Sequence, residues 1–387
     1  MTSGVRRSLA LALIARIPIG ALSLLIVLAV RDAGHPYAVA GLASGACALG
    51  MAISAPLMGR AADRVGQSVV LFASAVATAV SFAAFAALPD AAPPAVYAAV
   101  ALTCGLALPP VSASSRVVWG RMLDAAAFGR IVTLDASLQE LAFLVGPLVL
   151  VTAATVATPD AALVATGLGW GAVTAAFGAL PETRSVGGGP RAAAASILGP
   201  VTDPGVRTLL IVAVALGFCI GATELGVVNL AETHGALGLV AVLYGVWSLG
   251  SLVGGLLSMR RPPQDVVRRA QGLLVVVSLA TAALALAHDP LPLAILLAFA
   301  GVANAPLFGA LYTVMARIAP AGMVTEAYSL QTAGLTVGIA LGAAAGGAIA
   351  GAEGPSGVFL VAAAGMLVGV AVHALNMATL RPAPAVA

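Results

Sequence analysis

Twelve apolar segments run through this sequence, separated by short stretches that hold most of its charges and glycine clusters. They span residues 9–30, 38–58, 69–88, 95–115, 131–157, 161–180, 208–230, 236–258, 270–287, 291–315, 324–350 and 356–377. Each has about the 20 residues that a helix needs to cross a bilayer. Only 9% of the 387 residues are charged and 61% are hydrophobic, whereas a typical soluble domain has about 25% charged residues. Lipid must therefore surround most of the chain, which excludes a water-soluble globule.

The arginines alternate along these segments. All 18 basic residues are arginines, and all but Arg31 and Arg16 lie before the first segment, in every second gap or after the last. The other gaps carry one acid each: Asp32, Asp90, Asp160, Glu232, Asp289 and Glu353. By the positive-inside rule, both termini are cytoplasmic and the number of spans is even. Because the arginines set the topology, the net charge of +3 does not indicate a nucleic-acid partner.

The first apolar run follows Arg6 and Arg7 and could be mistaken for a signal peptide. It is as long as a full span and ends at Arg31-Asp32 without a convincing small-residue cleavage site. We therefore interpret it as the first membrane helix.

Three pairs of segments repeat one another. Segment 131–157 contains Val-Thr, Ser-Leu-Gln and Val-Gly, and segment 324–350 repeats them at an offset of 192. Ile-Gly-Ala recurs at an offset of 201, and the pair Pro110 and Arg121 recurs as Pro306 and Arg317 at 196. Chance explains any single match in text rich in Ala and Gly, but less easily three pairs in the same order. Because six is an even number, the two copies enter the membrane in the same direction.

The repeat predicts the domain organisation. We expect an N-terminal six-helix bundle over residues 1–180, a cytoplasmic linker over 181–206 and a C-terminal six-helix bundle over 207–387. The linker contains a Gly-Gly-Gly-Pro run and is too short to form a domain.

The turn after the second segment carries glycines and charges in a fixed order. It reads Gly59-Arg60-Ala61-Ala62-Asp63-Arg64-Val65-Gly66-Gln67-Ser68. With two parallel six-helix halves, the chain resembles the major facilitator superfamily, whose signature G-x-L-a-D-R-x-G-R-[KR] is matched at Gly59, Asp63, Arg64 and Gly66. The resemblance implies an all-α integral membrane fold of 12 transmembrane helices in two parallel six-helix repeats.

The same four residues are predicted to form a conformational latch. The glycines allow a tight turn, and Asp63 can meet the positive N-terminal end of a neighbouring helix or an arginine. An ordinary basic turn is the alternative, and it explains the charges but not their order. Gln67 and Ser68 replace the family's basic pair, which is expected to weaken the latch. The repeat counterpart, near Met259 to Arg269, is basic but lacks the glycines and the acid in register.

Features of the superfamily's drug:proton antiporters are only partly present. Segment 95–115 lacks the arginine that many of them carry, and Gly146-Pro147 is all that remains of their longer glycine-rich signature. The fold-level resemblance therefore covers nearly the whole chain, whereas the antiporter-specific one does not.

Four ionisable residues are predicted to lie within the membrane and to take part in proton coupling. An ionisable side chain there is costly and calls for a partner or a role. Glu140 and Arg16 lie ten and nine residues beyond the arginines that precede their segments, so their depths match, and we expect them to pair. Proton coupling and a permanent buried ion pair are both open for them. Asp135 lies on the cytoplasmic side of Glu140, and Glu224 belongs to the outer third of its segment.

Neutral polar residues are candidates for the substrate cavity. Gln139 shares a helix face with Asp135, and it has a repeat mate in Gln331. Asn229 and Asn304 are further candidates, for which hydrogen bonding between helices is the ordinary alternative. Glu326 begins segment 324–350, where capping of the helix is expected.

We expect a secondary active transporter that works by alternating access, with proton-coupled efflux of a small, largely apolar compound. The alternatives are proton-coupled uptake or facilitated uniport of a small metabolite, and more remotely a membrane sensor or an intramembrane enzyme.

The sequence contains no HExxH, GxSxG or P-loop motif, and its three cysteines have no charged or His neighbour at metal-ligand spacing. We therefore predict no enzyme, no cofactor and no metal. The expected partners are a small-molecule substrate, protons and the lipid bilayer, and the expected state is a monomer in a bacterial cytoplasmic membrane.

Overall fold

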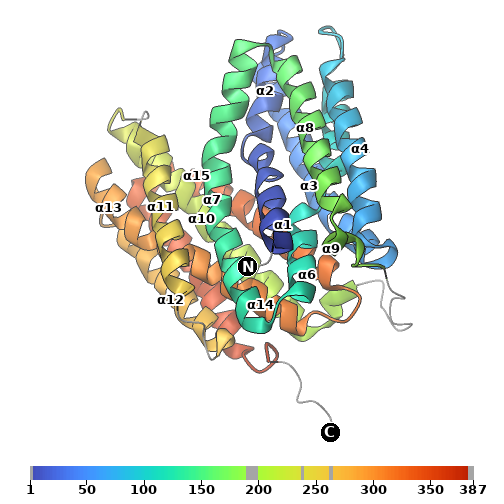
Figure 1. Cartoon of the computed structure of the whole chain (residues 1–387). Helices are drawn as coiled ribbons and strands as arrows, with labels where there is room; N and C mark the ends of the chain where they lie inside the picture. Colours follow the sequence, from blue (N-terminus) through green and yellow to red (C-terminus); the bar gives the residue numbers. More distant parts are fainter. Residues whose placement is uncertain (1–2, 189–198, 237–238, 261–264, 382–387) are drawn as a thin grey trace. The chain divides into compact units, whose positions relative to one another are not determined.

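The computed structural model describes residues 3–188, 199–236, 239–260 and 265–381, and these residues contain helices and no strands (Figure 1). The elements are α1 (Ser3–Ile14), η1 (Ile17–Gly20), α2 (Leu22–Asp32), α3 (Tyr37–Val65), α4 (Gln67–Ala86), α5 (Pro94–Ala107), α6 (Val111–Met122), α7 (Ala125–Val156), α8 (Pro159–Ala179), α9 (Pro181–Arg184), η2 (Gly199–Thr202), α10 (Pro204–Thr233), α11 (Val240–Ser258), α12 (Val266–Leu284), α13 (Pro290–Gly301), α14 (Asn304–Ile318) and α15 (Val324–Leu375). The predicted all-α class is thereby confirmed.

Every predicted apolar segment falls on a helix. The first corresponds to α1, η1 and α2, the fourth to α5 and α6, and the tenth to α13 and α14, while the last two share α15. Within the described ranges, nine helices are long and apolar enough to cross a membrane, or ten if the bent pair of α1–η1 and α2 is one span. The count of twelve crossings stays a prediction.

Proline and glycine explain where segments break. Pro18 lies in the 3₁₀ turn η1, and the helices on its two sides are bent by 43°, because proline lacks the N–H that would continue the helix. Pro109 and Pro110 separate α5 from α6 in the same way. Within α15, Gly354 has φ of 61° directly before Pro355, and this kink separates the two predicted segments that the helix contains.

The described chain forms two compact units. Unit 1 comprises Met1–Met122, Leu141–Ala195 and Ala321–Ser329. Unit 2 comprises Leu123–Glu140, Ser196–Pro320 and Leu330–Ala387. The first turns of α7 thus belong to unit 2, and the first turns of α15 to unit 1. The domain boundaries expected from the repeat stay a prediction, and part of the expected linker lies outside the described residues.

The packing inside each unit follows the repeat. In unit 1, α3 packs against α5, and in unit 2 the matching helices α11 and α13 pack together. Gly146 of α7 packs against the Ile17 carbonyl, and its repeat mate Gly338 of α15 packs against the Val214 carbonyl. In both pairs, the absence of a Cβ lets helix backbones approach closely, as is common between membrane helices. The offset of 192 therefore marks equivalent packing positions.

Candidate functional site

The end of α3 and the first turns of α15 lie in direct contact within unit 1. A Cβ on Gly59 would come within 2.6 Å of Ser329 Oγ and 2.9 Å of both Glu326 Cα and the Thr325 carbonyl oxygen. Only glycine leaves room for this approach, since real Cβ atoms do not come so close to backbone atoms. We call Gly59, Arg60, Asp63, Gln67, Thr325 and Glu326 the α3–α15 cluster.

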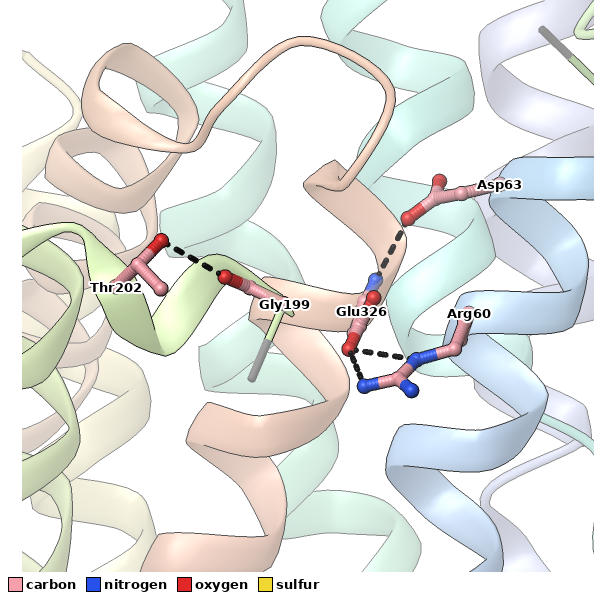
Figure 2. Close-up of polar contacts among 5 residues, drawn as sticks. All are labelled: Arg60, Asp63, Gly199, Thr202 and Glu326. Carbon is pink, nitrogen blue, oxygen red and sulfur yellow. Dashed lines mark hydrogen bonds and ion pairs between the residues drawn. The ribbon is translucent and has the colours of Figure 1, made fainter. Parts of the chain in front are cut away.

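Asp63 caps α15 from a different helix. One carboxylate oxygen accepts a hydrogen bond from the Thr325 backbone N–H at 3.1 Å, and the other accepts from the Glu326 N–H at 2.9 Å. Figure 2 shows the Asp63 side chain reaching toward the start of α15 from α3. The first N–H groups of a helix have no partner within it and carry a partial positive charge. The carboxylate satisfies both needs at once.

Arg60 pairs with Glu326 one helical turn before Asp63 (Figure 2). Its Nε and Nη2 donate to Glu326 Oε1 at 2.9 and 2.6 Å. The Glu326 side chain is 1% exposed and that of Arg60 is 29% exposed, so the pair lies at the edge of the interior. The sequence predicted that Glu326 caps this turn. In the structure Asp63 caps it, and the Glu326 carboxylate pairs with the guanidinium of Arg60.

Gln67, the first residue of α4, connects the cluster to α6. Its Nε2 donates to Thr325 Oγ1 at 2.6 Å, and its Oε1 accepts from Ser114 Oγ at 2.7 Å. The sequence predicted only that Gln67 weakens the latch, because it replaces a basic residue of the family signature. Sequence reasoning missed the role of Gln67 because the partners, from α15 and α6, are identified only by the fold.

The other two predicted latch residues shape the turn. Gly66 has φ of +100°, a conformation that residues with a Cβ rarely adopt. The backbone N–H of Gln67 after it donates to the Val186 carbonyl at 3.3 Å. Arg64 has an exposed side chain, so its charge is not part of the buried network.

Arg16 lies in the chain between α1 and η1 of unit 1 and is buried against α6. It is 2% exposed, its Nε donates to Ser112 Oγ at 2.8 Å, and its Nη2 is 3.5 Å from Ser115 Oγ. The Glu140 side chain lies outside the described part of the structure, so the predicted pairing with Arg16 stays a prediction. A buried guanidinium needs hydrogen-bond partners, and the Ser112 hydroxyl is one of them.

The two remaining predicted acids differ in burial. Asp135 of α7 is fully buried, whereas Glu224 of α10 is half-buried. The Tyr244 hydroxyl donates to the Glu224 backbone carbonyl at 2.9 Å, which joins α11 to α10. Both acids lie in long apolar helices, as the sequence predicted.

The four neutral cavity candidates occupy separate positions. Gln331 is 4% exposed and lines a pocket of about 10 Å³ with Phe308 and Tyr312. Its Oε1, and Oδ1 of Asn229, are buried oxygens without a hydrogen-bond partner among the described residues. Asn304 is buried at the start of α14 and Gln139 is half-buried in α7.

No group of three or more His, Cys, Asp or Glu side chains able to hold a metal was found within the described ranges. The three cysteines are buried free thiols.

Several known transporters have the same fold. The human organic anion transporter MFSD10 (TETRAN) gives a TM-score of 0.74 at 16% identity, covering 96% of this chain and 100% of that chain. A bacterial homologue of the iron transporter ferroportin, in an outward-facing state, gives 0.77 at 13% identity, with 97% and 100% covered. The E. coli fucose:proton symporter gives 0.74 at 10% identity, with 96% and 98% covered. No curated protein sequence matches this chain.

The model of the Major Facilitator Superfamily matches residues 9–288, which is most of the chain. With the apolar helices, this match identifies a multi-pass membrane protein with a transporter fold. The family and the neighbouring structures point to a non-enzymatic transporter. The chain belongs to the Major Facilitator Superfamily.

Proposed function

We propose that the protein is a secondary active transporter that exports a small, largely apolar compound in exchange for protons by alternating access. The observation that carries the coupling is the burial of an acid, Asp135, in a helix of a superfamily member. A carboxylate is expensive inside a membrane, and protonation removes that cost. Such a group can therefore hold a proton in one part of a transport cycle and release it in another.

The apolar character of the substrate is supported by the neutral cavity candidates. Gln331 and Asn229 offer buried acceptor oxygens, and the residues around Gln331 are mostly apolar or aromatic. A mostly apolar lining with few polar groups suits a compound with little charge. The neighbouring structures include an organic anion transporter and a fucose:proton symporter, so uptake and a more polar substrate are the alternatives to be tested.

Transport into reconstituted vesicles with an imposed pH gradient tests the coupling. The probes are a panel of uncharged aromatic dyes that begins with N-phenyl-1-naphthylamine, and a pH-sensitive dye inside the vesicles reports proton movement. Antiport moves the probe toward the acidic side, symport moves it toward the alkaline side, and a uniporter responds to neither gradient direction. We expect the probe to accumulate on the acidic side. Its rate of uptake and the rate of proton movement should both rise with the size of the pH gradient, and to the same degree.

Substitution of the acids assigns the coupling residue. Asp135→Asn, Glu140→Gln and Glu224→Gln each remove one charge with little change in shape. Asp90→Asn, in an exposed loop, is the matched control. We expect at least one of the three to lose gradient-driven flux while the control retains it. Retention of gradient-driven flux in all three variants would contradict the carboxylate mechanism.

We further propose that Gly59, Asp63, Arg64 and Gly66 act as a conformational latch, with the α3–α15 cluster as its contact. The capping of α15 by Asp63 supports this role, because a contact between helices distant in sequence can be broken and remade. Asp63→Asn should change the rate at which a thiol reagent reaches Gln139→Cys in a chain without its three native cysteines. Unchanged labelling would contradict the latch.

We propose a bacterial cytoplasmic membrane as the location, with both termini inside and the protein working as a monomer. The alternation of arginines and acids along the loops supports this orientation. A cysteine added at either terminus should react with a membrane-impermeant thiol reagent only after the cells are opened.

A further inference from the structure

Unit 2 contains a pocket with three arginines in its wall. The pocket has a volume of about 240 Å³ and lies between the first turns of α7, the end of α11, the start of α12 and α14. Arg130 comes from α7, Arg269 from α12 and Arg317 from the last turn of α14. No aspartate or glutamate is among the lining residues. The pocket is therefore a concave site with charge of one sign, and we call it the arginine pocket.

The acids that flank this pocket in sequence are engaged elsewhere. Asp124 Oδ1 accepts from the Ala127 N–H at 2.8 Å. Asp265 accepts from the backbone N–H groups of Val267 and Arg268 at 3.0 and 3.1 Å, and Arg381 Nη2 donates to its second oxygen at 3.1 Å.

These contacts keep Asp265 ionised. The backbone N–H of Arg268, with the guanidinium of Arg381 as a further cause, holds the pKa of the Asp265 carboxyl below its ordinary value. In the parts of the chain that the structure describes, neither Arg130 nor Arg317 has a carboxylate partner. Both side chains are exposed, so their guanidinium groups are accessible to an anion from outside the chain.

The shape and donors of the arginine pocket suit a phosphate group. The Arg269 Nη2 donates to Ser258 Oγ at 2.6 Å, which fixes the guanidinium against the pocket wall. A guanidinium presents paired N–H donors that match two phosphate oxygens.

The volume limits the size of the ligand. A pocket of about 240 Å³ is smaller than the roughly 300–1,000 Å³ that drug-sized ligands occupy. It can hold a phosphate or a small headgroup, but it is too small to enclose a drug-sized compound.

We propose that the arginine pocket binds a phosphate-bearing anion, supplied either by the headgroup of an anionic phospholipid or by free phosphate. Basic pockets between membrane helices on the cytoplasmic side bind anionic headgroups in other proteins. In unit 1, the anion at the matching part of the repeat is the carboxylate of Asp63. In unit 2, the residue at the position of Asp63 is Met259, an uncharged residue in the pocket wall. The ligand supplies from outside the charge that unit 2 lacks. The inference concerns binding alone and does not depend on the direction or coupling of transport.

Binding to the full-length protein in an uncharged detergent tests the proposal. Short-chain phosphatidylglycerol, short-chain phosphatidylcholine and sodium phosphate are titrated separately, and binding is followed by calorimetry and by native mass spectrometry. Arg269→Gln and Arg317→Gln should each weaken binding about tenfold, as expected for the loss of a hydrogen bond to a charged group. Two controls should bind like the wild type. Arg268→Gln removes the adjacent exposed arginine, and Arg121→Gln removes the repeat mate of Arg317.

A second variant keeps all three arginines. Met259→Asp puts a carboxylate into the pocket wall, where it should compete with the ligand and weaken binding at least tenfold. Met259→Leu is its control and should leave the affinity unchanged. This variant distinguishes loss of the ligand from loss of the fold, because a competing internal anion preserves the positive charges and their partners.

The outcomes separate the two sources of phosphate. Saturable binding of phosphatidylglycerol without binding of phosphate assigns the headgroup, and the reverse assigns the free anion; either result supports the site if the arginine variants reduce it. The proposal is overturned if neither ligand binds, if phosphatidylcholine binds equally well, or if Arg268→Gln reduces affinity as much as Arg269→Gln.

Discussion

The α3–α15 cluster of unit 1 and the arginine pocket of unit 2 are built from matching parts of the repeat but carry different charges. In unit 1, Asp63 and Glu326 provide two acids that meet a helix N-terminus and Arg60. In unit 2, three arginines line a pocket without an acid. The α3–α15 cluster pairs its charges within the chain, whereas Arg130 and Arg317 of the arginine pocket have no carboxylate partner in the described ranges. A duplicated scaffold can therefore keep its packing while its charges take different roles.

The packing around these two sites is more alike than the charges. Ser329 of α15 lies against Gly59, and its repeat mate Ser137 of α7 lies against Gly255. Gly255 stands four residues, about one helical turn, before Met259, the first residue of the predicted counterpart of the Gly59 turn. The glycine expected to be missing from the second copy is present one turn earlier, so helix contact with a serine is retained in both units.

The largest expected effect is the loss of Arg60. Arg60→Gln leaves the Glu326 carboxylate, 1% exposed, without its guanidinium partner, and we expect a loss of about 2 kcal/mol in unfolding free energy. This is below the 3–5 kcal/mol typical of fully buried pairs, because Arg60 is 29% exposed. Intrinsic tryptophan fluorescence during unfolding by detergent measures the change.

The matched variant in unit 2 is Arg317→Gln. Since Arg317 is exposed and has no carboxylate partner in the described ranges, its loss should change stability by less than about 0.5 kcal/mol without the phosphate ligand. Glu326→Gln should cost less than Arg60→Gln, since the remaining arginine reaches water. Equal losses from Arg60→Gln and Arg317→Gln would remove the distinction between a satisfied cluster and an open site.

The second effect in size concerns the close approach at Gly59. Gly59→Ala brings a Cβ to 2.9 Å from backbone atoms of α15, which cannot rotate away, so we expect a loss of about 1.5 kcal/mol from overpacking. At Gly255, the atom met first is the Ser137 hydroxyl, which can turn aside in part, and the loss from Gly255→Ala should be smaller. Gly45→Ala, in open space on the same helix as Gly59, is the control and should not destabilise the protein. A larger loss at Gly255 than at Gly59 would contradict this order.

The third effect tests capping between helices against capping within one. Asp63→Asn removes the charge that caps α15 and should cost about 1 kcal/mol. Asp124 caps α7 from within the same stretch of chain, and Asp124→Asn should cost a similar amount or less. The two variants differ in rate: only Asp63→Asn should speed hydrogen exchange in the first turns of α15, measured by mass spectrometry. Equal exchange in the wild type and Asp63→Asn would show that other contacts hold this turn.

Local features of the sequence predicted much of the fold. Apolar runs of about 20 residues located the helices, and the family signature singled out Gly59 and Asp63. The sequence also offered two partners for Asp63, a helix N-terminus or an arginine. Such properties follow from short stretches of chain, where hydropathy, proline and glycine act directly.

Contacts between distant stretches of the chain could not be predicted. Nothing in the sequence identified α15 as the helix that Asp63 caps, or Ser114 and Thr325 as the partners of Gln67. The arginine pocket also depends on the fold, because Arg130, Arg269 and Arg317 lie on three separate helices. The alternation of arginines along the sequence predicted on which side of the membrane each loop lies. It could not predict that three of these arginines line one pocket. The predicted counterpart of the Gly59 turn, near Met259 to Arg269, begins about one helical turn after Gly255, where the helix contact in unit 2 lies.

The smallest expected effect concerns Asp265, the acid beside the arginine pocket. Its pKa lies below the ordinary value because of the Arg268 backbone N–H first, with Arg381 as a further cause. A carboxyl with a lowered folded-state pKa stabilises the protein above its ordinary pKa of about 3.9 and loses that contribution as the pH falls through the folded-state value. The contribution should be below about 1 kcal/mol, because the side chain is 37% exposed and water screens the charge.

Asp265→Asn should therefore lower the stability slightly at neutral pH and remove part of its decline below about pH 4, measured by unfolding at a series of pH values. Because Asp265 serves the start of α12 and Arg381 rather than the arginines that line the pocket, the same variant should leave phosphatidylglycerol affinity within about twofold of the wild type. A marked gain in affinity would mean that Asp265 supplies counter-charge to the pocket. Both units would then use an acid of the chain, Asp63 in unit 1 and Asp265 in unit 2, and the two sites would differ only in how strongly that acid neutralises the arginines.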